Sequence, residues 1–451
     1  MRFLRYNIRM YQWLRSAVVA ILTFEAQLVL RRHQPKIIAV TGSAGKTSTK
    51  DAIFTVLSDS PPRLASQGEA GRHVRKSEKS YNSELGVPLT ILGLESGWGS
   101  PMRWLVNVVK GAWVVVGSDP YPKWLVLEVG ADRPGDIRRI AKWLRPDVAV
   151  ITSIPNIPVH VEYFHSPAAL ANEKKRLAEH MKHDGLLVIN GDDVHTKAIL
   201  KEYESQAVSF GFEGQNAFVA RDMGIQYDNK RPVGMHFYSE HSGSRHDVTL
   251  IGALGKPRVY AALAALAVAE AAGVPQEAAA EALKGWEPPP GRMRIINGLK
   301  DSLLIDDTYN SSPAAAHSAL DMLEDIKGFK KKIAVLGDML ELGRFSKEAH
   351  IEVGKHAARA ATMLCTVGLR ARAIAETALD NGLPESNVRQ YEQGESERAG
   401  KELEPILDKN TLVLIKGSQS MRMEKAVEEI MAEPARAPEL LVRQDADWKA
   451  R

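Results

Sequence analysis

Short apolar runs alternate with helix-like segments along most of the chain. In the first half, runs rich in branched residues predict buried strands at residues 36–40, 124–130, 147–154 and 185–190. In the segment that starts at Thr47, apolar residues recur with the spacing of one helix face. Strands that alternate with helices predict a mostly parallel sheet with both faces covered.

A second pattern of the same kind follows a clear break. Residues 205–250 alternate more strictly and hold more turn residues, which predicts a local β region, and an alanine-rich helix is expected at 259–272. The stretch WEPPPGRMR at 286–294 stops any helix and marks a boundary. Beyond this boundary, strands are predicted at 302–306, 332–337, 363–368 and 411–415.

The two patterns predict an α/β protein with two α/β domains. A chain of 451 residues is too long for a single core, which agrees with this division. We expect an N-terminal helical extension at 1–34, a central domain at 35–290, a C-terminal domain at 291–433, and a polar, irregular tail at 434–451.

The N-terminal extension combines arginines with a short apolar stretch that Glu25 and Gln27 interrupt before it could span a bilayer. No small-residue cleavage site follows it, so it does not resemble a signal peptide. The arginines lie at its two ends: Arg2, Arg5, Arg9, Arg15, Arg31 and Arg32. Two interpretations remain open. The segment is an amphipathic helix on an anionic membrane face, or a helix docked on the next domain with its arginines solvated.

Composition and charge narrow the class of protein. The sequence is 44% hydrophobic and 25% charged, as in ordinary globular proteins, and its net charge of +4 argues against a dedicated nucleic-acid binder. Cys365 is the only cysteine, so the chain holds no internal disulfide, which fits a reducing cytoplasm. We expect a cytoplasmic monomer, with a peripheral membrane contact through residues 1–34 as one option.

The stretch AVTGSAGKTSTKDAI at 39–53 predicts a phosphate-binding loop. Gly42 and Gly45 allow a tight turn with inward N–H groups, and a helix N-terminus follows, which favours an anion. Lys46 adds a charge near the terminal phosphates, and the Thr47 hydroxyl is placed to meet their Mg²⁺. Without Lys-Thr, this spacing would more simply predict a strand-to-helix turn.

Other candidates are weaker when taken alone. Glu128 ends a predicted strand, where a carboxylate could hold Mg²⁺ opposite Thr47, although such a residue is more often a surface or capping residue. His160 lies in a proline-interrupted loop and Lys174 on the next predicted helix. Their chemistry by itself does not distinguish them from a loop histidine and a solvated lysine.

The order of motifs resembles the Mur ligase family from about residue 36 to about residue 431. The motifs are TGSAGKTS, YNSELGVPLTIL, EVGADRPGDI, ITSIPNIPVHVEYF with ANEKKRL, VINGDD, PGRMR, DDTYNSSPAA, VLGDMLELG and IKGSQSMRME. DDTYNSSPAA and VLGDMLELG are most similar to the branch that adds D-alanyl-D-alanine to a muramoyl tripeptide. The resemblance implies a P-loop central domain, a Rossmann-like C-terminal domain, and an ADP-forming amide ligase of peptidoglycan precursor synthesis that works through an acyl phosphate.

The resemblance also implies roles for single residues. The ATP phosphates would meet Gly42, Ser43, Ala44, Gly45, Lys46, Thr47 and Ser48. Thr47 and Glu128 resemble ligands of a first Mg²⁺, His160 a ligand of a second, and Lys174 the family's carbamylated lysine. Asn82 resembles an asparagine near the γ-phosphate. Arg292 and Asp307 resemble residues that meet ATP, and Asn310, Lys416 and Ser418 are expected near the incoming amine substrate.

The sequence departs from the family at several places, among them Ser83 and Gln419, which stand where the family commonly has an asparagine and an arginine. In GKPRVYAA, Arg258 and Ala261 replace asparagines that lie near adenine, so the adenine contacts must differ. Only some 35 residues precede the first predicted strand, fewer than the roughly 50 of a small domain. We therefore expect no domain for the UDP end of the substrate, so that the uridine site is missing or another protein supplies it.

Two other functions remain open. One is a different Mur-like ligase, of the poly-γ-glutamate or cyanophycin type, or the ligase partner of an amidotransferase. The single cysteine excludes the zinc-binding form of that partner. The other is a nucleotide-binding scaffold without catalysis, which the complete set of Lys46, Thr47, Glu128, His160 and Lys174 argues against.

Overall fold

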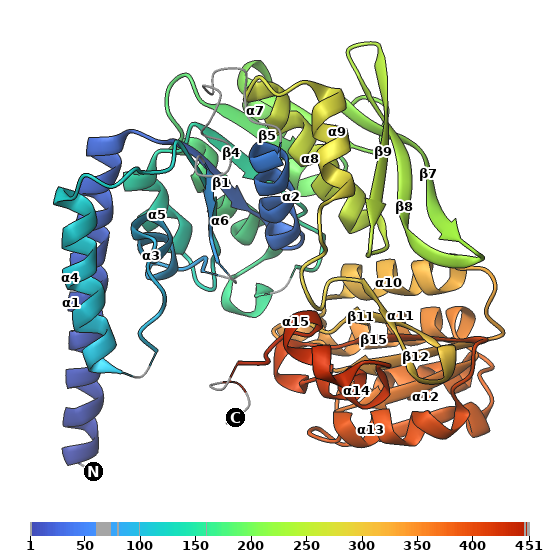
Figure 1. The fold of residues 1–451 in the computed structure, drawn as a ribbon. Coiled ribbons are helices and arrows are strands. Elements are labelled where there is room, and N and C mark those ends of the chain that lie inside the picture. The colour runs from blue at the N-terminus through green and yellow to red at the C-terminus, as the bar shows by residue number, and fades with distance from the viewer. Residues whose placement is uncertain are drawn as a thin grey trace. The chain divides into compact units, whose positions relative to one another are not determined.

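A computed structural model of the chain describes residues 2–59, 74–78, 81–98, 100–158, 160–445 and 448, with side chains from residue 15 onward. The chain divides into two compact units. The first contains Met1–Ser153, Ala168–Phe218 and Ala261–Ala282, and the second contains Ile154–Pro167, Val219–Tyr260 and Leu283–Arg451. The helices and strands of both units are labelled in Figure 1.

The first sheet is mixed and mostly parallel, as predicted. Its strand order is β2-β3-β1-β4-β5-β6-β7-β8-β9. Strands β1 to β6 run parallel, whereas β8 pairs with β7 and β9 antiparallel, which confirms the predicted β region. The strands are β1 (Lys36–Thr41), β2 (Val74–Lys76), β3 (Trp124–Glu128), β4 (Val148–Ile151), β5 (Leu186–Asn190), β6 (Ala207–Gly211), β7 (Phe218–Asp228), β8 (Arg231–His241) and β9 (Ser244–Ile251).

Strand β1 lies between β3 and β4, where helices can cover both faces of the sheet. Its residues from Ile37 to Thr41 are all buried, which explains why the sequence shows a continuous apolar run there instead of an alternation. The helices between the strands are α2 (Lys46–Asp59), α3 (Gly86–Leu92), α5 (Asp136–Leu144), α6 (Pro167–Glu179), α7 (Val194–Glu202), α8 (Lys256–Ala271) and α9 (Gln276–Lys284).

The N-terminal segment is one long helix, α1 (Arg2–His33), which packs beside α3 and α4 (Pro101–Val116) (Figure 1). Among its described side chains, from Arg15 onward, the fully buried apolar ones are Leu22, Ala26 and Val29. The helix is therefore docked on the first unit through its C-terminal half. Among the described residues, no helix is both long enough and apolar enough to cross a membrane.

The contact of α1 with α4 contains a buried carboxyl group. Glu25 is only 7% exposed, and an added Cβ at Gly111 on α4 would lie 2.1 Å from its Oε2 atom. Burial raises the pKa of Glu25 to about 7, because an ionised carboxylate loses hydration there. The folded protein therefore keeps this carboxyl group protonated over a pH range in which the unfolded chain ionises it.

Stability should consequently fall with rising pH because of Glu25. Its contribution is complete below the unfolded pKa of about 4.5 and is lost as the pH rises to about 7. Glu25→Gln keeps the shape without the charge, so we expect it to melt about 2–4 °C above the wild type at pH 8, on the order of 1 kcal/mol. Thermal melts at pH 5 and pH 8 test this. An equal gap at both pH values would contradict it.

The second unit contains a six-stranded sheet with the order β10-β11-β15-β12-β13-β14, in which only β10 is antiparallel to its neighbour. Helices α10 and α11 lie on one side of this sheet and α13 and α14 on the other (Figure 1). The elements are β10 (Arg294–Asn297), β11 (Leu303–Asp307), α10 (Pro313–Asp325), β12 (Lys331–Gly337), α11 (Ser346–Ala360), β13 (Met363–Val367), α12 (Arg372–Asp380), β14 (Val388–Tyr391), α13 (Ser396–Leu403), β15 (Thr411–Lys416) and α14 (Glu424–Ile430).

The prediction of an irregular tail is wrong for the described part of residues 434–451. The tail forms a short helix, α15 (Ala437–Leu440), and packs Ala437 and Leu441 into the core beside β15 and α14. The polar composition hid this because the buried apolar residues are few and closely spaced. Residues 446, 447 and 449–451 lie outside the described residues.

Candidate active site

The phosphate-binding loop predicted at 42–48 joins β1 directly to α2. The backbone N–H groups of Ser43 and Ala44 donate to the carbonyl of Ser153, at 2.8 Å and 3.3 Å. Gly45 has a φ of 85°, and a Cβ at Gly42 would lie 1.9 Å from Oγ1 of Thr152, so no larger residue fits there. The loop therefore has the tight turn that the sequence predicts.

Lys46, Thr47 and Ser48 form the first turn of α2. The ammonium group of Lys46 donates to the carbonyl of Gly42 at 2.9 Å, so it lies back over the loop. A helix N-terminus carries a partial positive charge and free N–H groups. A lysine folded over that terminus is the arrangement that binds the terminal phosphates of a nucleotide.

Thr47, Glu128 and Asn82 form a contiguous polar chain. The Thr47 hydroxyl donates to Oε2 of Glu128 at 2.9 Å, and the Asn82 amide donates to Oε1 of the same carboxylate at 3.0 Å. Glu128 is 1% exposed at the C-terminal end of β3, beside β1. Thr47 and Asn82, which are distant from Glu128 in the sequence and were predicted separately, therefore meet at its carboxylate.

The donor set at this carboxylate fits a magnesium ion. Among the residues that the structure describes, no group of three or more His, Cys, Asp or Glu side chains could hold a metal. Mg²⁺ commonly takes only one or two protein ligands and completes its shell with water and phosphate oxygens. The Thr47 hydroxyl and the Glu128 carboxylate, next to a phosphate loop, match that requirement.

Lys174 is buried on α6, with 2% of its surface exposed. Burial lowers its pKa well below the usual value, and the positive charge of Lys46 lowers it further. Its neighbour Glu173 has a different task, because its carboxylate accepts from the N–H groups of Ile137 and Arg138 at the start of α5. Lys174 is therefore not the solvated lysine of the alternative interpretation, and its neutral amine form is favoured.

His160 belongs to the second unit. It adopts a left-handed backbone conformation, with a φ of 65°, and its Nδ1 atom lies 2.6 Å from Oε2 of Glu341. The hydrogen bond with His160 lowers the pKa of Glu341. Glu341 comes from the VLGDMLELG motif, so two of the motifs singled out in the sequence are joined by this contact.

The remaining predicted residues of the second unit meet at the ends of β11 and β15. The Lys416 ammonium group donates to Oδ2 of Asp307 at 2.6 Å and to the carbonyl of Asn310 at 2.9 Å. The guanidinium group of Arg292 lies 3.9 Å from the centre of the Tyr309 ring. Ser418 accepts a hydrogen bond from the N–H group of Leu340 at 2.9 Å. Lys416 and Ser418 thus hold the loops on which Asn310 and Leu340 lie.

Comparison with known families decides the identity. Residues 40–100 and 118–269 match the Mur ligase middle domain, and residues 291–419 match the domain described as "Mur ligase, glutamate ligase domain". The chain belongs to the Mur ligase family. Mur ligases are ATP-dependent amide ligases, so the short phosphate loop is part of an enzyme of that class.

Several relatives of this Mur ligase have names and structures. The UDP-N-acetylmuramoyl-tripeptide–D-alanyl-D-alanine ligase of Bacillus subtilis is 29% identical over 91% of this chain and 79% of its own. The MurF ligase of Thermotoga maritima, in complex with ADP, is 26% identical with a TM-score of 0.71, over 91% of this chain and 83% of its own. MurF of Acinetobacter baumannii gives the same identity and TM-score, over 91% and 79%.

Arg258 and Ala261, the two residues of this Mur ligase that replace the family's asparagines near adenine, are both packed in the interior. Arg258 is 2% exposed, its guanidinium group lies 3.3 Å from the centre of the Trp286 ring, and it donates to the carbonyl of Trp286 at 3.1 Å. Ala261 is buried as well. Both side chains are therefore part of the packing. A cavity of about 460 Å³ beside Trp286 is lined by none of the predicted site residues.

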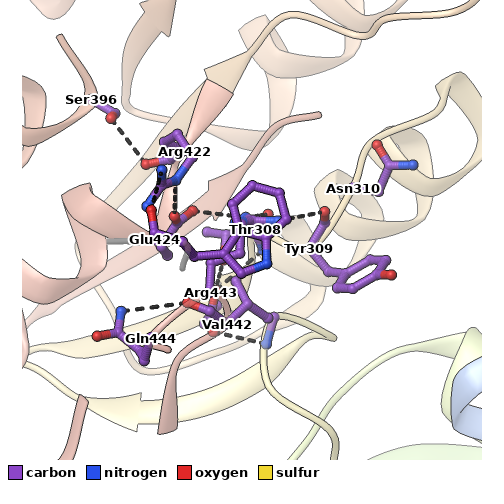
Figure 2. Close-up of polar contacts among 12 residues, drawn as sticks. Thr308, Tyr309, Asn310, Ser396, Arg422, Glu424, Val442, Arg443 and Gln444 are labelled. Carbon is purple, nitrogen blue, oxygen red and sulfur yellow. Dashed lines mark hydrogen bonds and ion pairs between the residues drawn. The ribbon is translucent and has the colours of Figure 1, made fainter. Parts of the chain in front are cut away.

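Sequence analysis missed Arg443, which holds the loop after β11 (Figure 2). Its Nη2 atom donates to the carbonyl of Thr308 at 2.6 Å and lies 2.7 Å from Oε2 of Glu424, and its Nη1 atom donates to the carbonyl of Tyr309 at 3.2 Å. Arg422 binds the other oxygen of Glu424 at 2.6 Å. The only signal in the sequence was an arginine in a tail that was expected to be irregular.

Arg443→Ala should loosen this loop without unfolding the first unit. It leaves two backbone carbonyls and one oxygen of a buried carboxylate without their donor, which should cost the second unit about 2 kcal/mol of unfolding free energy. Urea unfolding measures the loss. Arg436→Ala is the matched control, since Arg436 lies in the same tail but pairs with surface carboxylates. Equal behaviour of the two variants would contradict the role of Arg443.

Proposed function

We propose that this Mur ligase joins D-alanyl-D-alanine to the terminal carboxylate of a muramoyl peptide in peptidoglycan precursor synthesis. Support comes from the relatives that carry this name and align over most of the chain. The observation that carries the proposal is the polar chain from Thr47 through Glu128 to Asn82, directly beside the phosphate loop. The reaction takes place in the cytoplasm, where ATP is available.

The first step transfers a phosphoryl group. A carboxylate oxygen of the acyl substrate attacks the γ-phosphorus of ATP, an acyl phosphate forms, and ADP leaves. Lys46 and the backbone N–H groups of the loop stabilise the negative charge on the phosphates as it moves. Asn82, which Glu128 holds in place, is assigned to orient the γ-phosphate and the acyl group. This step makes the carboxylate a good acyl donor.

The second step forms the amide bond. The amine nitrogen of D-alanyl-D-alanine attacks the acyl carbon, a tetrahedral intermediate forms, and inorganic phosphate leaves with the loss of one proton from nitrogen. Arg292 and Asp307 are assigned to ATP, and Asn310, Lys416 and Ser418 to the amine side. The bonds from Lys416 to Asp307 and to the carbonyl of Asn310 support a positioning role for this lysine.

Two Mg²⁺ ions and a modified lysine complete the proposal. Thr47 and Glu128 would hold the first ion and His160 would ligate the second. The ions neutralise phosphate charge when bound. Lys174 is assigned as a carbamate, since its lowered pKa favours the neutral amine that adds to CO₂ with release of a proton. The carbamate is an anion, which suits a site for cations.

Phosphate release tests the function. Muramoyl tripeptide, with and without UDP, is combined with D-alanyl-D-alanine, L-alanine, D-glutamate or L-glutamate in the presence of ATP and Mg²⁺. We expect release only when both substrates are present, and a kcat/KM for D-alanyl-D-alanine at least tenfold above the others. A preference for glutamate would instead indicate a poly-γ-glutamate type of ligase. Nucleotide binding without release for any pair would indicate a scaffold.

A further inference from the structure

Helix α4 exposes a stripe of large apolar side chains. Met102, Leu105, Val106, Val109, Trp113 and Val116 are each between 43% and 71% exposed. Apart from the adjacent pair Leu105 and Val106 they recur every three or four residues, and at 100° per residue all six lie on one face of the helix. Asn107 and Gly111 are buried on the opposite face. We call these six residues the α4 stripe.

The stripe is distinct from ordinary scattered exposure. Most of the large apolar side chains that are exposed in the described residues lie on α4 or on the adjacent helix α1, where Ile21 and Phe24 are exposed too. The remaining ones, such as Leu369 and Val194, occur singly. A continuous apolar patch on a water-soluble surface is usually an interaction site.

The exposed charges on the described parts of the two helices are all positive. The exposed charged residues on the described parts of α1 and α4 are Arg15, Arg31, Arg32, Arg103 and Lys110. The only acidic residue in those parts is Glu25, which is buried. Arg103 and Lys110 are seven residues apart and each lies three residues before a member of the stripe, Val106 and Trp113, so they border it.

The apolar stripe and the positive charges of α1 and α4 together indicate the chemistry of the partner. A helix that has an apolar face with a tryptophan, and whose own charged residues are all cations, is typical of helices that lie in the interface of an anionic bilayer. The sequence extends the positive charge further, because Arg2, Arg5 and Arg9 precede any acidic residue of α1. We propose that the α4 stripe, with Ile21 and Phe24 of α1, docks on an anionic lipid surface.

The packing of α1 on α4 supports this role. Arg32 donates a hydrogen bond to the carbonyl of Val115 in the last turn of α4, and Leu22, Ala26 and Val29 are buried at the base of α1. The two helices lie side by side (Figure 1). The cations of α1 are therefore held next to the helix that carries the α4 stripe, and each strengthens attraction to anionic headgroups.

Vesicle flotation tests the proposal without any need for ligase activity. The full chain is mixed with vesicles of phosphatidylcholine containing 30% phosphatidylglycerol, or of phosphatidylcholine alone. We expect at least tenfold tighter partitioning to the anionic vesicles, weakened by salt. Leu105→Asp with Val109→Asp should lower the partitioning at least tenfold, and Arg103→Glu with Lys110→Glu should remove the preference for anionic lipid.

Control variants distinguish binding of the α4 stripe to a bilayer from binding to another partner. Leu369→Asp replaces an equally exposed apolar side chain of the second unit and should leave partitioning unchanged. Lipids with brominated acyl chains should quench the tryptophan fluorescence of the wild type more than that of Trp113→Phe. Thermal melts should show that every variant is folded. No flotation of the wild type, or flotation that the α4 variants do not change, overturns the proposal. A dimer that forms without lipid and that Leu105→Asp with Val109→Asp disperses would show a second copy as the occupant.

Discussion

Lys46→Ala is expected to lower the rate of amide formation by a hundredfold or more. Its ammonium group bonds back to the carbonyl of Gly42, so its charge lies over the loop that would receive the phosphates. No other side chain of the loop carries a charge, and the loss of that charge leaves the moving phosphoryl group less well stabilised. A hundredfold loss corresponds to about 2.7 kcal/mol. Steady-state phosphate release with saturating substrates measures it.

The fold should survive this change because Lys46 is only half-buried and lies in the first turn of α2, where alanine is a good helix former. Thermal melting should therefore differ little from the wild type. Lys142→Ala is a suitable control, since Lys142 is an exposed lysine on α5 of the same unit and should keep full activity. Near-normal turnover of Lys46→Ala would refute the assignment of the loop to the transferred phosphate.

Lys174→Ala is expected to abolish measurable activity, a loss of at least a hundredfold. If Lys174 carries a carbamate, alanine removes an anion that supports the cations of the site, and short carboxylic acids should restore part of the rate by occupying its place. Lys174→Arg should stay inactive because it retains a positive charge that cannot be lost. Dialysis in CO₂-free buffer should lower the wild-type rate, and bicarbonate should restore it.

A neighbouring residue provides the control for Lys174. Lys175 pairs with Glu202 and Glu179 near the surface, which raises the pKa of Lys175, in contrast to that of Lys174. Lys175→Ala should therefore keep most of the activity and should not respond to added carboxylic acids. An active Lys174→Arg would show that a positive charge serves at this position, and the carbamate proposal would then fail.

Much of the fold was predicted because the strands and helices, and their order along the chain, follow from periodicity within contiguous residues. The apolar runs at 36–40 and 411–415 became central strands of the two sheets, since a strand buried on both faces must be apolar throughout. Helix α4 was not anticipated. Its exposed face is apolar, so it lacks the polar side that normally marks a surface helix.

The sequence alone determined the family and the tight turn after β1, and it predicted the phosphate loop there, because these rest on residues that are adjacent in the chain or on motifs in a fixed order. Only the tertiary structure decided the contacts and the pKa shifts of individual side chains. Thr47 and Glu128 are 81 positions apart, yet they share a hydrogen bond because β3 pairs with β1. The pKa of Lys174 and the contacts of Arg443 depend on burial by distant segments, which no local pattern encodes.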